Sequence, residues 1–371
     1  MSALTVGTRP PVVEQLTSRL FRLPLSRPWG EDVPALHLLV TELTTDDGRT
    51  GTGFSWTPSI GARAVQALVE HDVAPVVVGG PTDPGVVWDR LWWHLHEAGG
   101  GGLTTMAIAA VDIALWDLGA RAAGRSLVDH LGRRRESVPA YGSGVNLHYP
   151  LDELREQARR WVAQGCRGVK IKVGRPDLAE DVERVAAVRE VIGPHRQLMV
   201  DANQRWDLPT ALRAVRALSR FDLYWVEEPL VADDLPALSR LHDAGFGVPI
   251  AVGENVYTTY QYRHLLASGA ADVVQPNAVR VGGITPFLRI AQLARAASVP
   301  VAPHLLPDLS GQLALCLPDT TMVEDVEDAS FAALGALAQP SGVTVAGGVL
   351  RAETGPGHGL VFATDRLEEM D

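Results

Sequence analysis

The chain has 371 residues, of which 46% are hydrophobic and 21% are charged, and its formal net charge is -11. This composition is typical of a soluble globular protein, and the negative charge argues against nucleic acid or an anionic membrane as a partner. The length leaves room for one large barrel and a smaller domain.

The cysteines indicate the cellular compartment, and the apolar runs indicate whether the chain crosses a membrane. Cys166 and Cys316 are 150 residues apart and form no CxxC motif, which is typical of reduced thiols in the cytoplasm. The N-terminus lacks the continuous apolar core of a signal peptide, and no uninterrupted apolar run reaches about 18 residues. We therefore expect a soluble, cytoplasmic protein.

Residues 1–134 predict an α+β domain. The runs LTSRLFRLPL, PALHLLVTELTT and RTGTGFSW alternate as an antiparallel sheet does, and Asp47-Gly48 between the last two is a strong hairpin signal. Helical patterns follow near residues 60–74 and 84–97. The segment MAIAAVDIALWDLGARAAG then has apolar residues at helical spacing and ends at a glycine.

Residues 135–330 alternate between strand and helix patterns, which predicts a barrel of parallel strands. Short, nearly all-apolar strands are what a parallel sheet buried on both faces requires. The strand candidates are VPAYGSGVN, GVKIKVG, QLMVDAN, LYWVEEP, VPIAVGEN, ADVVQPN and VPVAPHL, and the eighth unit is hard to see. Residues 331–371 are irregular and Gly-rich, and we interpret them as returning to the first domain.

Three acids follow apolar stretches at nearly equal intervals. Asp201, Glu227 and Glu254 are separated by 26 and 27 residues, which is about one strand-plus-helix unit. They should therefore emerge side by side at the C-terminal ends of consecutive strands. Three oxygen ligands select a hard cation and suit Mg²⁺ better than Zn²⁺. Glu228 should point to the other side of its strand, because neighbouring side chains alternate.

Two lysines and a histidine are the candidate bases. Lys170 and Lys172 are two residues apart on one predicted strand, so their side chains share a face. Surface lysines are the usual case, but an acid-facing pair inside the barrel fits the pattern VKIKV better. One could hold a substrate carboxylate while the other acts as a base. His304 ends a later strand, across the barrel from the lysines.

This set of residues resembles the enolase superfamily, and within it the mandelate racemase-like subgroup (the mandelate racemase/muconate lactonizing enzyme family). The resemblance covers essentially the whole chain and implies a modified TIM barrel, (β/α)7β, with an α+β capping domain built from the N-terminal region and the C-terminal tail. It implies that Asp201, Glu227 and Glu254 bind Mg²⁺, that Lys172 and His304 act on opposite faces of the substrate, and that Lys170 pairs with its carboxylate. It also implies that Asn203 and Glu324 bind the substrate, with Asp319 and Asp325 as competitors for the second position.

One position departs from the family. Members with a histidine base usually have an aspartate at the end of the preceding strand, whereas this chain has Asn277 there. An amide can orient the imidazole of His304 but cannot neutralise an imidazolium, unless Asp308 takes over that function. Trp29 and Trp56 lie in loops of the first domain that could cover the barrel mouth and contact the substrate, although packing within the domain explains them equally well.

The expected function is removal of the α-proton of a small-molecule carboxylate through a metal-stabilised ene-diolate. With Lys172 and His304 on opposite faces, we favour racemisation or epimerisation of a 2-hydroxy acid. One alternative is a dehydratase of an acid sugar that uses the same site. A second alternative, suggested by Asn277, is a non-catalytic homologue that binds metal and carboxylate. We expect a homo-oligomer.

Overall fold

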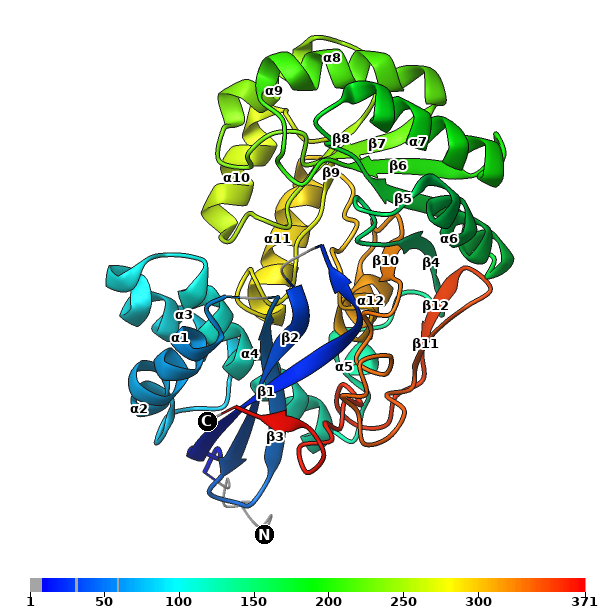
Figure 1. The fold of residues 1–371 in the computed structure, drawn as a ribbon. Helices are drawn as coiled ribbons and strands as arrows, with labels where there is room; N and C mark the ends of the chain where they lie inside the picture. The colour runs from blue at the N-terminus through cyan, green and yellow to red at the C-terminus, as the bar shows by residue number, and fades with distance from the viewer. Residues whose placement is uncertain (1–8, 31–32, 59, 371) are drawn as a thin grey trace.

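The first layer of the molecule is a four-stranded antiparallel sheet. The computed structural model describes residues 9–30, 33–58 and 60–370. The sheet has the order β13-β1-β2-β3. Its strands are β1 (Val13–Trp29), β2 (Val33–Thr45), β3 (Thr50–Thr57) and β13 (Glu368–Glu369). The last strand comes from the C-terminal tail, so both ends of the described chain meet in this sheet (Figure 1).

Helices cover one face of this sheet, and the central one is α4 (Leu103–Ala122). Gly51 and Gly53 of β3 allow the close approach, because a Cβ at either position would lie within 2.2 Å of a carbonyl oxygen of α4. By length and composition α4 could cross a membrane, but 78% of its apolar window is buried inside the fold, as in the core helix of a folded domain. The other helical segments are α1 (Ala62–Ala67), a π-helical turn (Leu68–Val73), α2 (Ala74–Val77), α3 (Pro84–Leu95), a 3-10 turn (His96–Ala98) and α5 (Leu127–Leu131).

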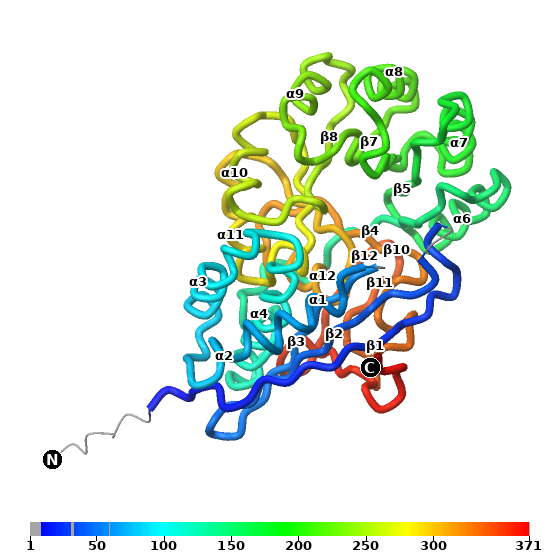
Figure 2. Tube along the Cα trace, turned by 60° about the vertical axis from the view of Figure 1, so that its left-hand side comes forward, coloured from blue at the N-terminus to red at the C-terminus, as the bar shows by residue number. Residues whose placement is uncertain are grey.

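The second part of the chain forms a parallel barrel, seen in green to orange in Figures 1 and 2. Six strands, β4 to β9, follow one another in sequence order. The seventh strand position is reduced to isolated β-bridges at Val301, and β10 closes the barrel by pairing with β4. The strands are β4 (Val138–Ser143), β5 (Gly168–Lys172), β6 (Gln197–Asp201), β7 (Leu223–Glu227), β8 (Ile250–Val252), β9 (Val273–Val274) and β10 (Val323–Val326). The helices between them are α6 (Leu151–Ala163), α7 (Leu178–Ile192), α8 (Leu208–Leu218), α9 (Leu235–Asp243), α10 (Thr259–Ser268), α11 (Ile284–Ala296) and α12 (Pro307–Cys316).

Seven strand–helix units followed by one strand confirm the predicted (β/α)7β barrel with its capping domain. The eighth strand, which the sequence pattern does not reveal, has only four residues and carries the charged pair Glu324-Asp325. After β10 the chain forms the hairpin of β11 (Val343–Ala346) and β12 (Val349–Ala352), and β12 pairs antiparallel with β4. The tail thus contacts the barrel first. It then returns to the capping domain, where its strand β13 pairs with β1.

The capping domain holds the loop that follows β9. Trp88 Nε1 donates to the carbonyl of Gly282 at 2.9 Å, and Thr105 Oγ1 donates to the carbonyl of Arg280 at 2.7 Å. Asp112 of α4 accepts from the backbone N–H of Thr285 at 2.9 Å, where α11 begins without a side-chain cap of its own. The position of this loop therefore depends on side chains of α3 and α4.

Asp112 gives this contact a pH dependence. Burial raises the pKa of its carboxyl from 3.8 to about 7, although the hydrogen bond from Thr285 opposes the shift. A raised folded-state pKa stabilises the fold below the unfolded value, and this contribution is lost as the pH rises from about 4 through about 7. Asparagine does not titrate, so Asp112→Asn should lack this loss. The free energy of unfolding of the variant minus that of wild type should therefore be larger at about pH 8 than at about pH 5, by roughly 1–3 kcal/mol. Urea unfolding at both pH values measures it.

The exposed Asp152→Asn is the matched control, because it makes the same exchange of aspartate for asparagine at the surface. A pH-independent difference between Asp112→Asn and wild type would contradict the assignment of a raised pKa to Asp112.

Candidate active site and metal centre

Consecutive strands bring the predicted charged residues to one level of the barrel. In the parallel register Lys172 of β5 pairs with Asp201 of β6, and Asp201 pairs with Glu227 of β7. Glu227 pairs with Ala251 of β8, and Glu254 follows three residues later. The equal spacing in sequence therefore becomes a row of side chains across neighbouring strands, at the C-terminal end where barrel enzymes place their sites.

Asp201, Glu227 and Glu254 have the geometry of a metal centre. Each offers one carboxylate oxygen, and these atoms all lie within 4.8 Å of one another. All three residues are buried, and burial raises the pKa of Glu227 to about 8 even though Lys170 opposes the shift. Oε2 of Glu254 accepts no hydrogen bond among the described residues. Three crowded carboxylates with an unpartnered oxygen fit a hard divalent cation, which would relieve their repulsion.

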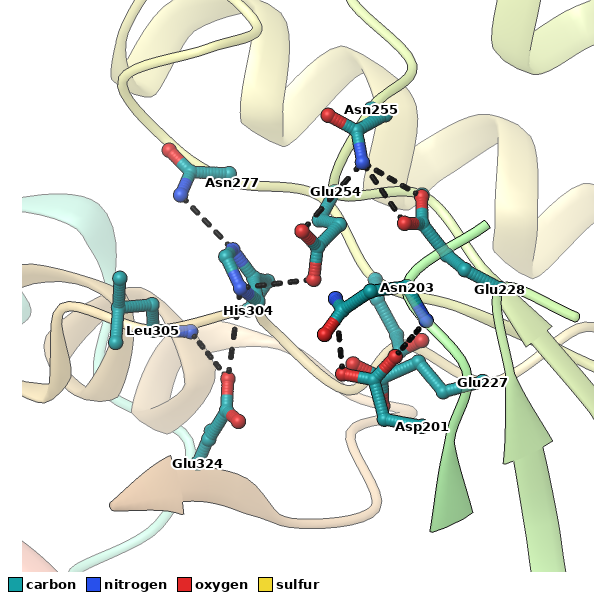
Figure 3. A network of polar contacts seen from close by, with 12 residues as sticks. Asp201, Asn203, Glu227, Glu228, Glu254, Asn255, Asn277, His304, Leu305 and Glu324 are labelled. Carbon is teal, nitrogen blue, oxygen red and sulfur yellow. Dashed lines mark hydrogen bonds and ion pairs between the residues drawn. The ribbon is translucent and has the colours of Figure 1, made fainter. Parts of the chain in front are cut away.

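The polar surroundings restrict how each acid can bind. Oε2 of Glu227 accepts from Trp225 Nε1 at 3.1 Å and from Gln275 Nε2 at 2.7 Å. Oδ1 of Asp201 accepts from the backbone N–H of Asn203 at 2.8 Å, while the Asn203 amide lies 3.3 Å from Oδ2. Lys170 and Lys172 donate to the remaining oxygens of Glu227 and Asp201, so Oε2 of Glu254 is the one oxygen of the three acids without a hydrogen-bond donor among the described residues. The three acids face one another in Figure 3.

Lys170 and Lys172 are the only lysines in the sequence, and both belong to this site. Lys170 is 1% exposed and its Nζ lies between Glu227 and Glu324, 2.7 Å from the latter. Burial lowers the pKa of Lys170, but these two carboxylates outweigh it and hold the pKa well above its ordinary value. Lys172 is 12% exposed and contacts Oδ2 of Asp201, which outweighs burial and raises its pKa.

His304 lies across the barrel from Lys172. Its Nδ1 is 3.0 Å from the Asn277 amide nitrogen. Its Nε2 is 3.0 Å from Oε2 of Glu254, without the alignment of a hydrogen bond, and 3.8 Å from Glu324. Asp308 does not replace the family's aspartate, because its carboxylate accepts from the Phe331 N–H and the Ser341 hydroxyl instead.

Glu324 is the residue that β10, the strand that closes the barrel, contributes to the site. Ser143 donates to its Oε1 at 2.7 Å and the Leu305 N–H donates to its Oε2 at 3.0 Å. Its competitor Asp319 pairs with Arg295 at the surface.

A cavity of about 190 Å³ opens above these groups. Trp29 and Trp56, in edge-to-face contact with ring centres 6.5 Å apart, form part of its wall. Four of the predicted residues do not line the cavity: Lys170, Asp201, Glu227 and Asn277. Asn277 lies behind His304 (Figure 3). The lining consists of Trp29, Trp56, Pro58, Ser143, Gly144, Val145, Lys172, Asn203, Glu254, Arg280, His304, Leu305, Glu324 and Val326.

Sequence reasoning missed three residues of the site. Arg280 lines the cavity and donates to the Glu254 carbonyl at 2.9 Å. Asn146 accepts from the backbone N–H of Lys172 at 2.9 Å. Glu228 was expected on the opposite side of its strand, but β7 ends at Glu227 and Glu228 has a φ of 40°. Its carboxylate lies beside Glu254, bound by the Asn255 amide at 2.8 Å.

Two family descriptions match this chain and between them cover both parts of the fold. “Enolase C-terminal domain-like” matches residues 153–366, and “Mandelate racemase / muconate lactonizing enzyme, N-terminal domain” matches residues 31–132. The chain therefore belongs to the enolase superfamily, in its mandelate racemase/muconate lactonizing enzyme group.

Three relatives span nearly the whole chain. A 3,6-anhydro-α-L-galactonate cycloisomerase of Streptomyces coelicolor is 37% identical over 97% of this chain and 99% of its own length. A racemase structure from Streptomyces coelicolor with bound magnesium is 36% identical, with a TM-score of 0.90 over 96% of this chain and 99% of its own. The L-talarate dehydratase of a Polaromonas species, in complex with Mg and L-glucarate, is 38% identical, with a TM-score of 0.85 over 95% of each chain.

These relatives, together with the donor set described above, confirm the expected class and cofactor. The protein is a Mg²⁺-dependent enzyme of the enolase superfamily, and relatives such as the L-talarate dehydratase bind small carboxylates. Racemases, dehydratases and cycloisomerases share this chemistry, so both the racemase interpretation and the dehydratase alternative fit the family.

Proposed function

We propose that Lys172 removes the α-proton of a polyhydroxy carboxylate and that the reaction continues by loss of the oxygen on the next carbon. The observation that carries this proposal is the position of Lys172. Of the chain's two lysines, it alone lines the cavity, and it lies directly beside the metal ligand Asp201.

The other residues have supporting functions in this proposal. Asp201, Glu227 and Glu254 would hold Mg²⁺, which would supply positive charge to stabilise the negative charge on the substrate carboxylate. Lys170 contributes positive charge from below the same carboxylates. Asn203, Arg280 and Glu324 offer hydrogen bonds along the cavity wall.

The polarity of the cavity favours elimination from a substrate with several hydroxyl groups. Besides the metal ligand Glu254 and the indoles of Trp29 and Trp56, six side chains of the lining carry polar groups, which suits a substrate with several hydroxyls better than a largely apolar acid: Ser143, Lys172, Asn203, Arg280, His304 and Glu324. The amine of Lys172 takes the C2 proton, the C–H electron pair forms the C2=C3 double bond, and the C3 oxygen leaves with its bonding pair. The proton and a C3 hydroxide together make one water, and the enol that remains tautomerises to a 2-keto acid.

The same steps cover both a dehydratase and a cycloisomerase. A 3,6-anhydro acid carries an ether oxygen on C3, so the leaving oxygen stays attached through C6 and the product is an isomer of the substrate. The 37% identity to a 3,6-anhydro-α-L-galactonate cycloisomerase supports this substrate class.

Racemisation or epimerisation remains the second candidate, because Lys172 and His304 face the cavity from different walls. Incubation of the Mg²⁺-loaded protein with 3,6-anhydro-L-galactonate and with galactarate in D₂O separates the outcomes. We expect a 2-keto acid to form. Deuterated substrate and its C2 epimer without keto acid would favour epimerisation, and no reaction or exchange across a library of hydroxy acids and sugar acids would favour a pure binder.

The two lysines allow a second test of the base. An amine-selective reagent such as trinitrobenzenesulfonate can modify only Lys170, Lys172 and the N-terminal amine. We expect peptide mass spectrometry to find modification at the more exposed Lys172, with activity lost in proportion and protected by Mg²⁺ and substrate. Full activity of protein modified at Lys172 would refute its function as the base.

A further inference from the structure

The amide of Asn277 has only one orientation that satisfies its neighbours. Its Oδ1 lies 3.0 Å from the backbone nitrogen of Val279 and 3.1 Å from that of Arg280. Backbone N–H groups can only donate, so the atom that faces them must be the oxygen. Asn277 is fully buried, and the loop that supplies these donors is held by Thr105 and Trp88. The orientation is therefore fixed by main chain.

The fixed amide in turn determines where the neutral imidazole carries its proton. The NH₂ group of Asn277 points at Nδ1 of His304 from 3.0 Å (Figure 3). An amide NH₂ is only a donor, so Nδ1 must accept, and in the neutral ring the proton is then on Nε2.

A carboxylate on the other side of the ring agrees with this assignment. Oε2 of Glu324, which is not one of the three metal ligands, lies 3.8 Å from Nε2. A carboxylate oxygen suits a protonated nitrogen and repels a lone pair. The donor behind the ring and the acceptor in front of it therefore favour the same tautomer.

We propose that Asn277 is a positioning residue that holds His304 as the Nε2–H tautomer, so that His304 donates a hydrogen bond to a substrate oxygen and has no lone pair with which to take a proton from the substrate. This inference rests on the proposed function for the oxygen that it binds, and it deepens that function. Lys172 is then the only base, which suits elimination and not proton exchange at two faces. A neutral histidine that polarises a substrate oxygen is an established catalytic device.

A histidine spectrum tests the tautomer without any substrate. Mg²⁺-loaded protein with ¹⁵N-labelled histidine is measured about two pH units above the ordinary histidine pKa, where imidazoles are neutral. The His304 resonances are assigned by their loss in His304→Gln. We expect a protonated Nε2 and an unprotonated Nδ1. A protonated Nδ1 in the wild-type protein would overturn the proposal, whatever the outcome of the activity assays.

Asn277→Asp tests whether the amide is the cause. A carboxylate can accept from the Val279 and Arg280 N–H groups and from Nδ1–H together, so the His304 proton should move from Nε2 to Nδ1. An unchanged tautomer in this variant would remove Asn277 from its assigned function. The wild-type spectrum decides the tautomer by itself, so the test does not depend on the folding of the variant. Failure of the elimination assay with a confirmed Nε2–H would instead refute the proposed reaction alone.

Discussion

Replacing Lys172 by methionine should lower turnover and α-proton exchange at least about 10³-fold, because the reaction loses its base. The other lysine cannot substitute, since Lys170 is 1% exposed and is bound between Glu227 and Glu324. Mg²⁺ affinity should be retained, because none of the three ligands is changed. Deuterium incorporation from D₂O, followed by mass spectrometry at saturating Mg²⁺, measures the effect.

Lys172→Arg is the matched variant, because it keeps the positive charge beside Asp201 and removes only the ability to lose a proton. It should be as inactive as Lys172→Met. An arginine variant that exchanges the α-proton at more than about a tenth of the wild-type rate would show that the side chain acts through its charge alone.

Replacing Lys170 by methionine should mainly destabilise the fold. Its ammonium is the buried partner of Glu227 and Glu324, and removal of one partner from a buried ion pair costs about 3–5 kcal/mol. Urea unfolding without Mg²⁺ should show this loss, and saturating Mg²⁺ should recover part of it, because the cation neutralises Glu227.

Lys172→Met again provides the comparison, because Lys172 contacts Asp201 at the partly open cavity wall and its removal should cost less. Equal losses for both lysines, or a loss below about 1 kcal/mol for Lys170, would contradict the assignment of Lys170 as the buried counter-ion.

The metal site was predictable from the sequence because parallel strands convert equal spacing into register. Each strand–helix unit returns the chain to the same end of the barrel, so acids 26 and 27 residues apart meet at one level. The same argument placed Lys170 and Lys172 on one face, because β5 is regular through Lys172. These predictions depend only on periodicity, and periodicity holds within the strands.

Beyond the ends of the strands, the alternation of side chains no longer predicts which way a side chain points. Glu228 follows the last residue of β7, and its positive φ turns the carboxylate toward Glu254 and Asn255 instead of away from them. Arg280 and Asn146 lie in loops, and nothing in their sequence context distinguishes them from residues at the surface. Their positions depend on contacts with distant segments, such as the hydrogen bond from Thr105 to the Arg280 carbonyl.

The departure at Asn277 shows what sequence and structure each contribute. From the sequence, the loss of the family's aspartate could mean a weakened histidine or an inactive homologue. The structure adds the two backbone donors on Oδ1, which turn the amide nitrogen toward His304. The substitution then indicates a changed function for His304 and not the loss of an active site.

Diffraction from a crystal soaked in Mg²⁺ and a hydroxy-acid ligand tests the account most directly. We expect one ion at about 2.1 Å from an oxygen of each of Asp201, Glu227 and Glu254, with the ligand's α-carbon facing Nζ of Lys172. An ion bound elsewhere, or an α-carbon that faces away from Lys172, would contradict it.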